Sequence, residues 1–169
     1  KTSLYPSITI EEGQTTGSLT ISTEANAENN RNLILTPITN TGNLASKAPI
    51  ILDINDTIPP TMSLVATVNS DTLMSGSFSN QSEVLLTLTS SEPIQGFTVT
   101  DIARSANFTP EMSDFAQLND TTFTVIVKSF VDTKIYLNIL GDRFTDLSGN
   151  NNVPTSVYSW TYDKTPPTI

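Results

Sequence analysis

Polar and apolar residues alternate in short runs along most of the chain, and Gly, Asn and Pro separate the runs. Alternation with a period of two is typical of strands that bury one face, whereas no segment shows a helical period of useful length. From residue 58 to 163 the runs are frequent enough to build a sandwich of two sheets. The sequence predicts seven strands there, at 62–66, 83–89, 96–99, 114–118, 122–127, 135–139 and 156–162.

One face of these strands supplies the expected core. Phe123, Val125 and Val127 alternate with more polar neighbours, and we expect Leu118 and Trp160 to share their face. The three residues 119–121 (Asn-Asp-Thr) stand between two alternating runs and predict a hairpin turn. The predicted fold class is therefore all-β, an antiparallel β-sandwich of the immunoglobulin-like kind.

A different set of runs occupies the first 57 residues, with strands expected at 7–10, 17–22, 32–36 and 50–54. Four strands without a partner sheet would leave one aliphatic face in water, and an unpaired edge strand invites another strand. Three arrangements complete such a half-domain. These are a preceding part of the parent protein, a strand donated by a neighbouring subunit of a fibre, or strands shared with the second domain.

A repeated segment indicates tandem organisation. Asp-Thr-Ile-Pro-Pro-Thr at 56–61 returns as Asp-Lys-Thr-Pro-Pro-Thr at 163–168, which implies a module of roughly a hundred residues. The Pro-Pro pair fixes φ and offers no donors, so it stiffens the joint. We divide the chain into 1–57, part of one sandwich, 58–163, a complete domain, and 164–169, the start of a linker to a next domain. Neighbouring domains of the same chain are the expected partners.

Composition excludes several functions. The formal net charge of −9 disfavours nucleic acid, because no basic stripe faces the phosphates. The chain lacks Cys and His, which removes thiol nucleophiles, imidazole catalysis and His-ligated transition metals. It also has no apolar run long enough for membrane insertion in this segment. We therefore expect no enzyme activity.

Calcium is the leading chemical candidate, because it takes six to eight hard oxygens and Asp- and Asn-rich loops supply them. The alternative is that these side chains act as turn residues and bind nearby backbone amides, as Asp101 would in capping a short turn. No dense Asp-x-Asp-x-Asp-Gly run is present to decide between the two. The candidate ligands lie at the two joints and in the loops, and are Asp53, Asn55, Asp56, Asp101, Asp142, Asp146 and Asp163.

Longer motifs resemble known families. Ser-Ser-Glu-Pro-Ile-Gln-Gly-Phe-Thr-Val-Thr-Asp-Ile at 90–102, Asp-Leu-Ser-Gly-Asn at 146–150 and Trp-Thr-Tyr-Asp-Lys-Thr-Pro-Pro-Thr at 160–168 resemble the repeats of bacterial Ig-like domains. Residues 5–57, with Ile-Thr-Ile-Glu-Glu-Gly-Gln at 8–14, resemble the second half of a Calx-beta domain. The first resemblance implies a cell-surface, extracellular protein in which such repeats form stalks, and some relatives bind calcium between domains.

The sequence thus predicts a structural stalk or spacer of a large adhesin-like surface protein, or a subunit of a surface fibre. One alternative is a ligand- or carbohydrate-binding module that uses the loop at 103–113, with Arg104, Phe108 and Met112. Another is an accessory domain of a secreted hydrolase. Glycosylation is a further option that depends on the source, with Asn-x-Ser/Thr motifs at Asn55, Asn80, Asn107 and Asn119.

Overall fold

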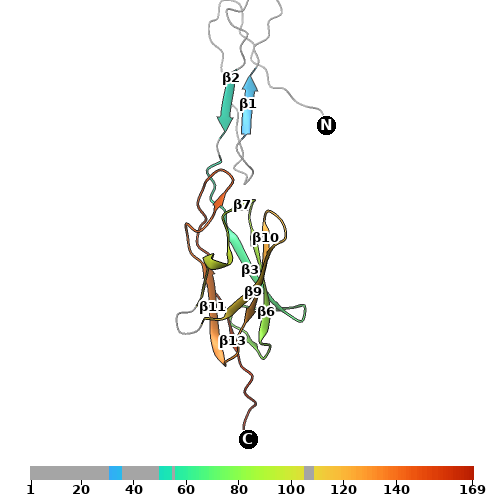
Figure 1. The fold of residues 1–169 in the computed structure, drawn as a ribbon. Helices are drawn as coiled ribbons and strands as arrows, with labels where there is room; N and C mark the ends of the chain where they lie inside the picture. Colours follow the sequence, from blue (N-terminus) through green and yellow to red (C-terminus); the bar gives the residue numbers. More distant parts are fainter. Residues whose placement is uncertain (1–30, 36–49, 55, 105–108) are drawn as a thin grey trace, which may run out of the picture.

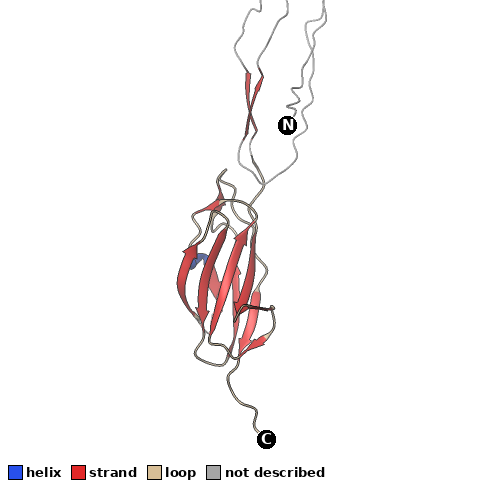
Figure 2. Ribbon diagram, turned by 90° about the vertical axis from the view of Figure 1, so that its right-hand side faces the viewer, coloured by secondary structure: helices blue, strands red, loops and turns tan. Residues whose placement is uncertain are grey.

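The structure is a computed structural model that describes residues 31–35, 50–54, 56–104 and 109–169 (Figure 1). Residues 56–163 form a module in which two sheets pack face to face, with strands running along its long axis (Figure 2). The regular elements of the described residues are strands, apart from a 3-10 turn, η1 (Val99–Asp101). The prediction of an all-β sandwich is confirmed.

The two large sheets are antiparallel except for one parallel pair, β5 with β13. The five-stranded sheet contains, in spatial order, β4 (Asp71–Leu73), β3 (Met62–Val68), β6 (Glu83–Ser90), β10 (Thr122–Lys128) and β9 (Glu111–Gln117). The four-stranded sheet contains β5 (Phe78–Ser79), β13 (Tyr158–Tyr162), β11 (Thr133–Ile139) and β8 (Ile102–Arg104). Two short ladders are β12 (Thr145–Asp146) with β7 (Ile94–Gln95), and β1 (Arg31–Leu35) with β2 (Ile50–Ile54).

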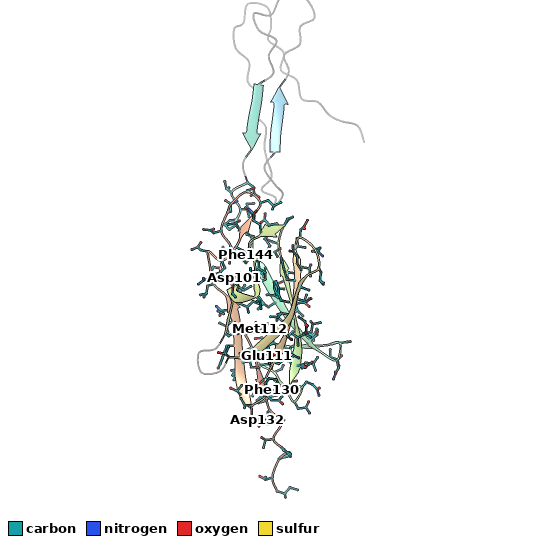
Figure 3. The ribbon with its side chains drawn as sticks, viewed as in Figure 1. Asp101, Glu111, Met112, Phe130, Asp132 and Phe144 are labelled. Carbon is teal, nitrogen blue, oxygen red and sulfur yellow. The ribbon has the colours of Figure 1, made fainter. Side chains whose placement is uncertain are left out.

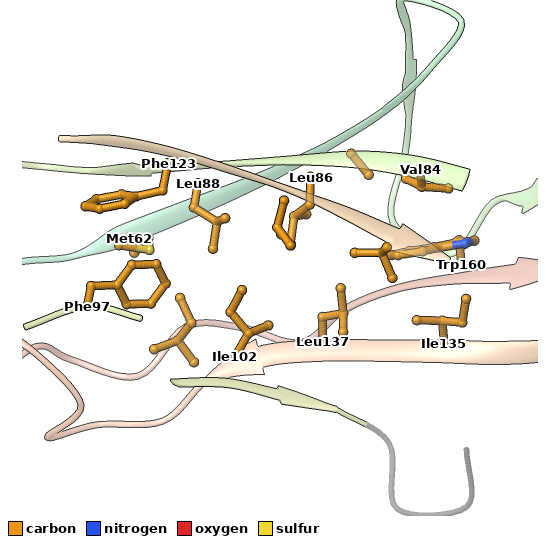
Figure 4. Close-up of a cluster of buried hydrophobic side chains, with 14 of the residues drawn as sticks. Met62, Val84, Leu86, Leu88, Phe97, Ile102, Phe123, Ile135, Leu137 and Trp160 are labelled. Atoms are coloured by element: carbon orange, nitrogen blue, oxygen red, sulfur yellow. The ribbon is translucent and has the colours of Figure 1, made fainter. Parts of the chain in front are cut away.

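The core fills the space between the two sheets and follows from the alternation along the strands. Every second residue of β6 is buried from Val84 onward, and Phe123, Val125 and Val127 lie beside these residues on β10, the neighbouring strand of the same sheet. Figure 4 shows Leu86 and Leu88 of one sheet opposite Ile102 and Leu137 of the other, with Trp160 and Phe123 towards its two ends. Because these side chains are almost fully buried, the core accounts for most of the hydrophobic stabilisation of the module.

Two sequence predictions about this core are wrong. Leu118 is 63% exposed. It lies opposite Thr122 in the hairpin, and Thr122 is the neighbour of the buried Phe123 along β10, so the Thr122 side chain points to the other face of the sheet. Directly opposed residues share a face, so Leu118 lies on the outside. The expected strand at 96–99 is absent, because Gly96 has φ +83 and Asp101 closes a capping box with Thr98. The hairpin turn is confirmed: the Asn119 carboxamide oxygen accepts the N–H of Thr121.

The first 57 residues are described in part only. The predicted strands at 32–36 and 50–54 correspond to β1 and β2, which pair antiparallel with Leu33 opposite Leu52. The predicted strands at 7–10 and 17–22 lie outside the described residues. What completes this half-domain therefore stays a prediction.

The module has two distinct ends (Figure 1). We call the end that carries 56–61, 90–95, 118–121 and 140–153 the entry end, and the end that carries 77–82, 129–132 and 163–165 the exit end. Backbone hydrogen bonds join Ser91 to Thr61 and Val153 to Pro60 at the entry end, and Asp163 to Ser79 at the exit end. The two copies of the repeated segment therefore lie at opposite ends.

Candidate metal centre

Three carboxylates meet at the entry end, although they are far apart in the sequence. Asp56, Glu92 and Asp146 each place a carboxylate oxygen within 4.8 Å of the other two. Glu92 is 4% exposed and Asp146 1% exposed, while Asp56 is half-buried. A cluster of acids with two members buried is an uncommon arrangement, because charged side chains are almost never buried unless they are paired or bind a metal.

The segment 56–61 brings Asp56 to this cluster and is bound to the module along its length. The Asp56 carboxylate accepts the N–H of Ile58 at 2.9 Å, which sets the first turn. Thr61 donates its N–H to the Ser91 hydroxyl at 3.0 Å and accepts the N–H of Ser91 at 2.9 Å. Pro60, almost fully buried, accepts the N–H of Val153. The segment is therefore part of the module rather than a free tether.

Asp146 is positioned by its own loop. One carboxylate oxygen accepts the N–H groups of Ser148 and Asn150, both at 2.8 Å, and the other accepts the side-chain amide of Asn150 at 2.7 Å. The same Asn150 amide donates to the carbonyl of Asp56 at 3.1 Å. Gly149, at φ +92, permits the turn that aims these donors. Asn150 thus joins the loop to the incoming segment.

Asn152 holds the rest of this loop together. Its side-chain oxygen accepts the N–H groups of Arg143 and Phe144, and its amide donates to the carbonyls of Leu140 and Val153. Phe144 then packs edge-on against Phe97 at 5.3 Å between ring centroids. The loop that carries Asp146 is therefore anchored both by hydrogen bonds and in the core.

Glu92 differs from the other two acids in its electrostatics. Burial, and after it the carboxylates of Asp56 and Asp146, raise the pKa of Glu92 from 4.5 to about 7. Its Oε1 atom is buried and has no hydrogen-bond partner among the described residues. Leaving such an atom without a partner costs about 1–3 kcal/mol, and more for a charged group. A cation placed among the three acids would remove this cost.

The donor set indicates which cations fit. The cluster offers only carboxylate oxygens, which suit hard cations such as Ca²⁺ and Mg²⁺. The arrangement can hold a metal ion, and two of its three ligands are already oriented by hydrogen bonds. A divalent cation would also neutralise most of the charge that the three acids gather.

The structure brings together two of the residues nominated from the sequence, Asp56 and Asp146. Asp101 instead accepts the N–H of Thr98 at 2.8 Å, as expected of a cap. Asp142 is exposed and Asp163 lies at the exit end, so neither joins the cluster. The side chain of Asp53 and all of Asn55 lie outside what the structure describes.

Sequence reasoning missed Glu92. It stands in Ser-Glu-Pro, where a charged residue before proline is typical of an exposed turn. The available signal was the alternation along β6, because Glu92 continues the period of two that runs through Leu88 and Ser90 to Ile94. The Ser90 hydroxyl donates to the Glu92 carbonyl at 2.5 Å, and this contact turns the segment at the end of β6.

The described part of the alternative binding loop is packed. Ala103 belongs to β8 and lies opposite Asn138, and Met112 packs against the core from β9. Arg104 donates to the carbonyl of Pro110 at 3.3 Å. Phe108 lies outside the described residues. Among the residues described here, this loop therefore presents no apolar cluster for recognition.

Comparisons with protein families, curated proteins and solved structures gave no match to this chain. The likeness to bacterial Ig-like and Calx-beta repeats therefore stays a prediction from the sequence. In the part of the chain that the structure describes, no helix has the length and apolar character needed to cross a membrane.

Proposed function

We propose that this chain is a spacer of an extracellular surface protein, and that calcium locks the joint through which the chain enters the module 56–163. The observation that carries the proposal is the position of the three acids. Asp56 belongs to the incoming segment, whereas Glu92 and Asp146 belong to the body of the module. An ion bound by all three would fix the direction of the segment relative to the sandwich.

The shape and chemistry of the module support a spacing role. Its two segments leave from opposite ends, each with a Pro-Pro pair that limits bending (Figure 1). Calcium is preferred over magnesium, because magnesium demands near-ideal octahedral geometry and gives up water reluctantly. Millimolar calcium outside cells would keep a site of ordinary affinity filled.

The test is thermal unfolding of the whole chain in about 5 mM calcium and in EDTA, followed by the fluorescence of Trp160, the sole tryptophan, which is 1% exposed. At roughly a thousandfold excess over the dissociation constant, a ligand bound only by the folded state stabilises it by about 4 kcal/mol. We expect calcium to raise the Tm by about 10 °C or more.

Two variants assign the effect to the site. Glu92→Gln removes the buried carboxylate and should abolish most of the calcium shift. Asp142→Asn removes the same charge from an exposed loop position and should leave the shift intact. Identical melting curves in calcium and EDTA for the unaltered chain would contradict the calcium lock. A shift that survives Glu92→Gln would place the ion elsewhere.

A further inference from the structure

The repeated segment exists in two environments within one chain. Residues 56–62 read Asp-Thr-Ile-Pro-Pro-Thr-Met and residues 163–169 read Asp-Lys-Thr-Pro-Pro-Thr-Ile, so the likeness extends to an apolar seventh position. Both copies begin with the same turn. The Asp56 carboxylate accepts the N–H of Ile58 and the Asp163 carboxylate accepts the N–H of Thr165, each at 2.9 Å.

The first copy is covered and the second is not. Pro60 is less than 2% exposed, and Met62 is 8% exposed at the start of β3. The corresponding Pro167 is exposed. The second copy thus leaves in solvent a proline whose counterpart in the first copy is buried against an entry end.

The second copy is nevertheless oriented by the module it leaves. Asp132 accepts the N–H of Lys164 at 3.0 Å and the hydroxyl of Thr165, and Asp163 donates its N–H to Ser79 at 3.0 Å. Asp132 lies in the turn between β10 and β11, at the end of the sandwich where the segment leaves (Figure 3). Among the residues that the structure describes, the hydrogen bonds that hold this segment therefore lie at its upstream part, residues 163–165.

Apolar side chains surround this departure point. Phe130 and Val131, beside Asp132, are 61% and 52% exposed, and Phe78 of β5 is 73% exposed. The entry end also carries exposed apolar side chains, Leu118 and Leu147. Exposed apolar residues gathered at an end of a domain are typical of an interaction surface.

We propose that residues 163–169 bind the entry end of a second domain of the same kind, in the way that residues 56–62 bind the entry end of this one. The partner would receive Ile169 at the position of Met62 and Pro167 at that of Pro60. Its serine equivalent to Ser91 would bond the backbone of Thr168. This proposal rests on the proposed spacer role and names the partner, a like domain that stacks on the exit end.

The test extends the whole chain at residue 169 with a second copy of residues 63–169, so that Ile169 takes the place of Met62. Amide hydrogen exchange is measured in EDTA, so that the result does not depend on metal. We expect the amides of Thr168 and Ile169 to exchange quickly in the original chain. In the extended chain we expect protection within about tenfold of that of Thr61 and Met62.

A matched extended chain carries the sequence of 56–62 in place of 163–169. The proposal is overturned if the second module folds in this matched chain but does not fold in the extended chain that keeps the native residues 163–169. It is also overturned if both modules fold and Thr168 and Ile169 still exchange at the rate of an unstructured peptide. Calcium titration of the original chain reports separately on the proposed function. Docking without a calcium effect would refute only the lock, and a calcium effect without docking would refute only this inference.

Discussion

Glu92 makes the free energy of unfolding depend on pH when no metal is bound. Its pKa is about 7 in the folded protein, against 4.5 for the ordinary group. The folded state therefore holds more protons than the unfolded state between these values, and Glu92 stabilises the fold fully only below about 4.5. We expect the free energy of unfolding in EDTA to fall as the pH rises from about 4.5 to 7, by at most about 3 kcal/mol from this residue.

Glu92→Gln is the control for this titration, because an amide carries no charge at either pH. Urea unfolding above pH 7 in EDTA should find the variant more stable than the unaltered chain, since a buried charge has been removed. In calcium the order should reverse, because only the unaltered chain keeps all three carboxylates. Parallel pH curves for the two proteins in EDTA would show that Glu92 does not ionise as described.

The site was only partly predictable at the level of single residues. Asp56 and Asp146 were nominated because they stand at a joint and in an Asp- and Asn-rich loop, and both do reach the cluster. Asp101 has the same local character, yet its turn binds it to Thr98. Which acid caps a turn and which reaches a cluster depends on contacts between distant segments. Glu92 shows this most clearly, because its partners Asp56 and Asp146 come from either side of it in the sequence.

At the scale of strands, alternation decides which leucines stabilise the fold. Leu88 of β6 is fully buried and Leu118 is 63% exposed, so the same substitution at each tests the register of the sheet. Leu88→Ala should cost about 2–5 kcal/mol, because it removes buried methyl groups and leaves a cavity. Leu118→Ala should cost less than about 0.5 kcal/mol. Urea unfolding in calcium measures both, and similar costs would contradict the register.

Long strands were predictable and short ones were not. β6 and β10 alternate over seven or eight residues, and they were located from the sequence to within a residue or so. β5, β7 and β12 have two residues each, which is too few for a period to be recognised. These short strands form because a partner strand supplies their hydrogen bonds. β5 pairs with the longer β13, and β7 and β12 pair with each other. Leu118 was assigned to the wrong face because the geometry of the turn sets the register of the hairpin, and a shift of one residue moves a side chain to the opposite face of the sheet.

At the scale of the whole molecule, Asp132 controls how the chain leaves the exit end. Hydrogen bonds from the Thr165 hydroxyl and then the Lys164 N–H hold the pKa of Asp132 below its usual value. Asp132→Ala removes the acceptor, so the Lys164 amide should exchange roughly tenfold faster, as expected for the loss of one hydrogen bond. Asp120→Ala, in an exposed turn at the entry end, should leave that rate unchanged. Equal rates in the Asp132 variant and the unaltered chain would show that the departing segment is held by other contacts.

The placement of the first and last strands of the module has a mechanical consequence. β3 starts at the entry end and pairs with β4 and β6, while β13 finishes at the exit end and pairs with β11 and β5. A force that pulls the two ends apart therefore acts along these strands, at right angles to the hydrogen bonds that hold them. Those bonds share the load and must break together in shear, not one after another as in a strand peeled from its end. The sandwich would thus resist stretching in the direction in which a chain of such modules would be pulled.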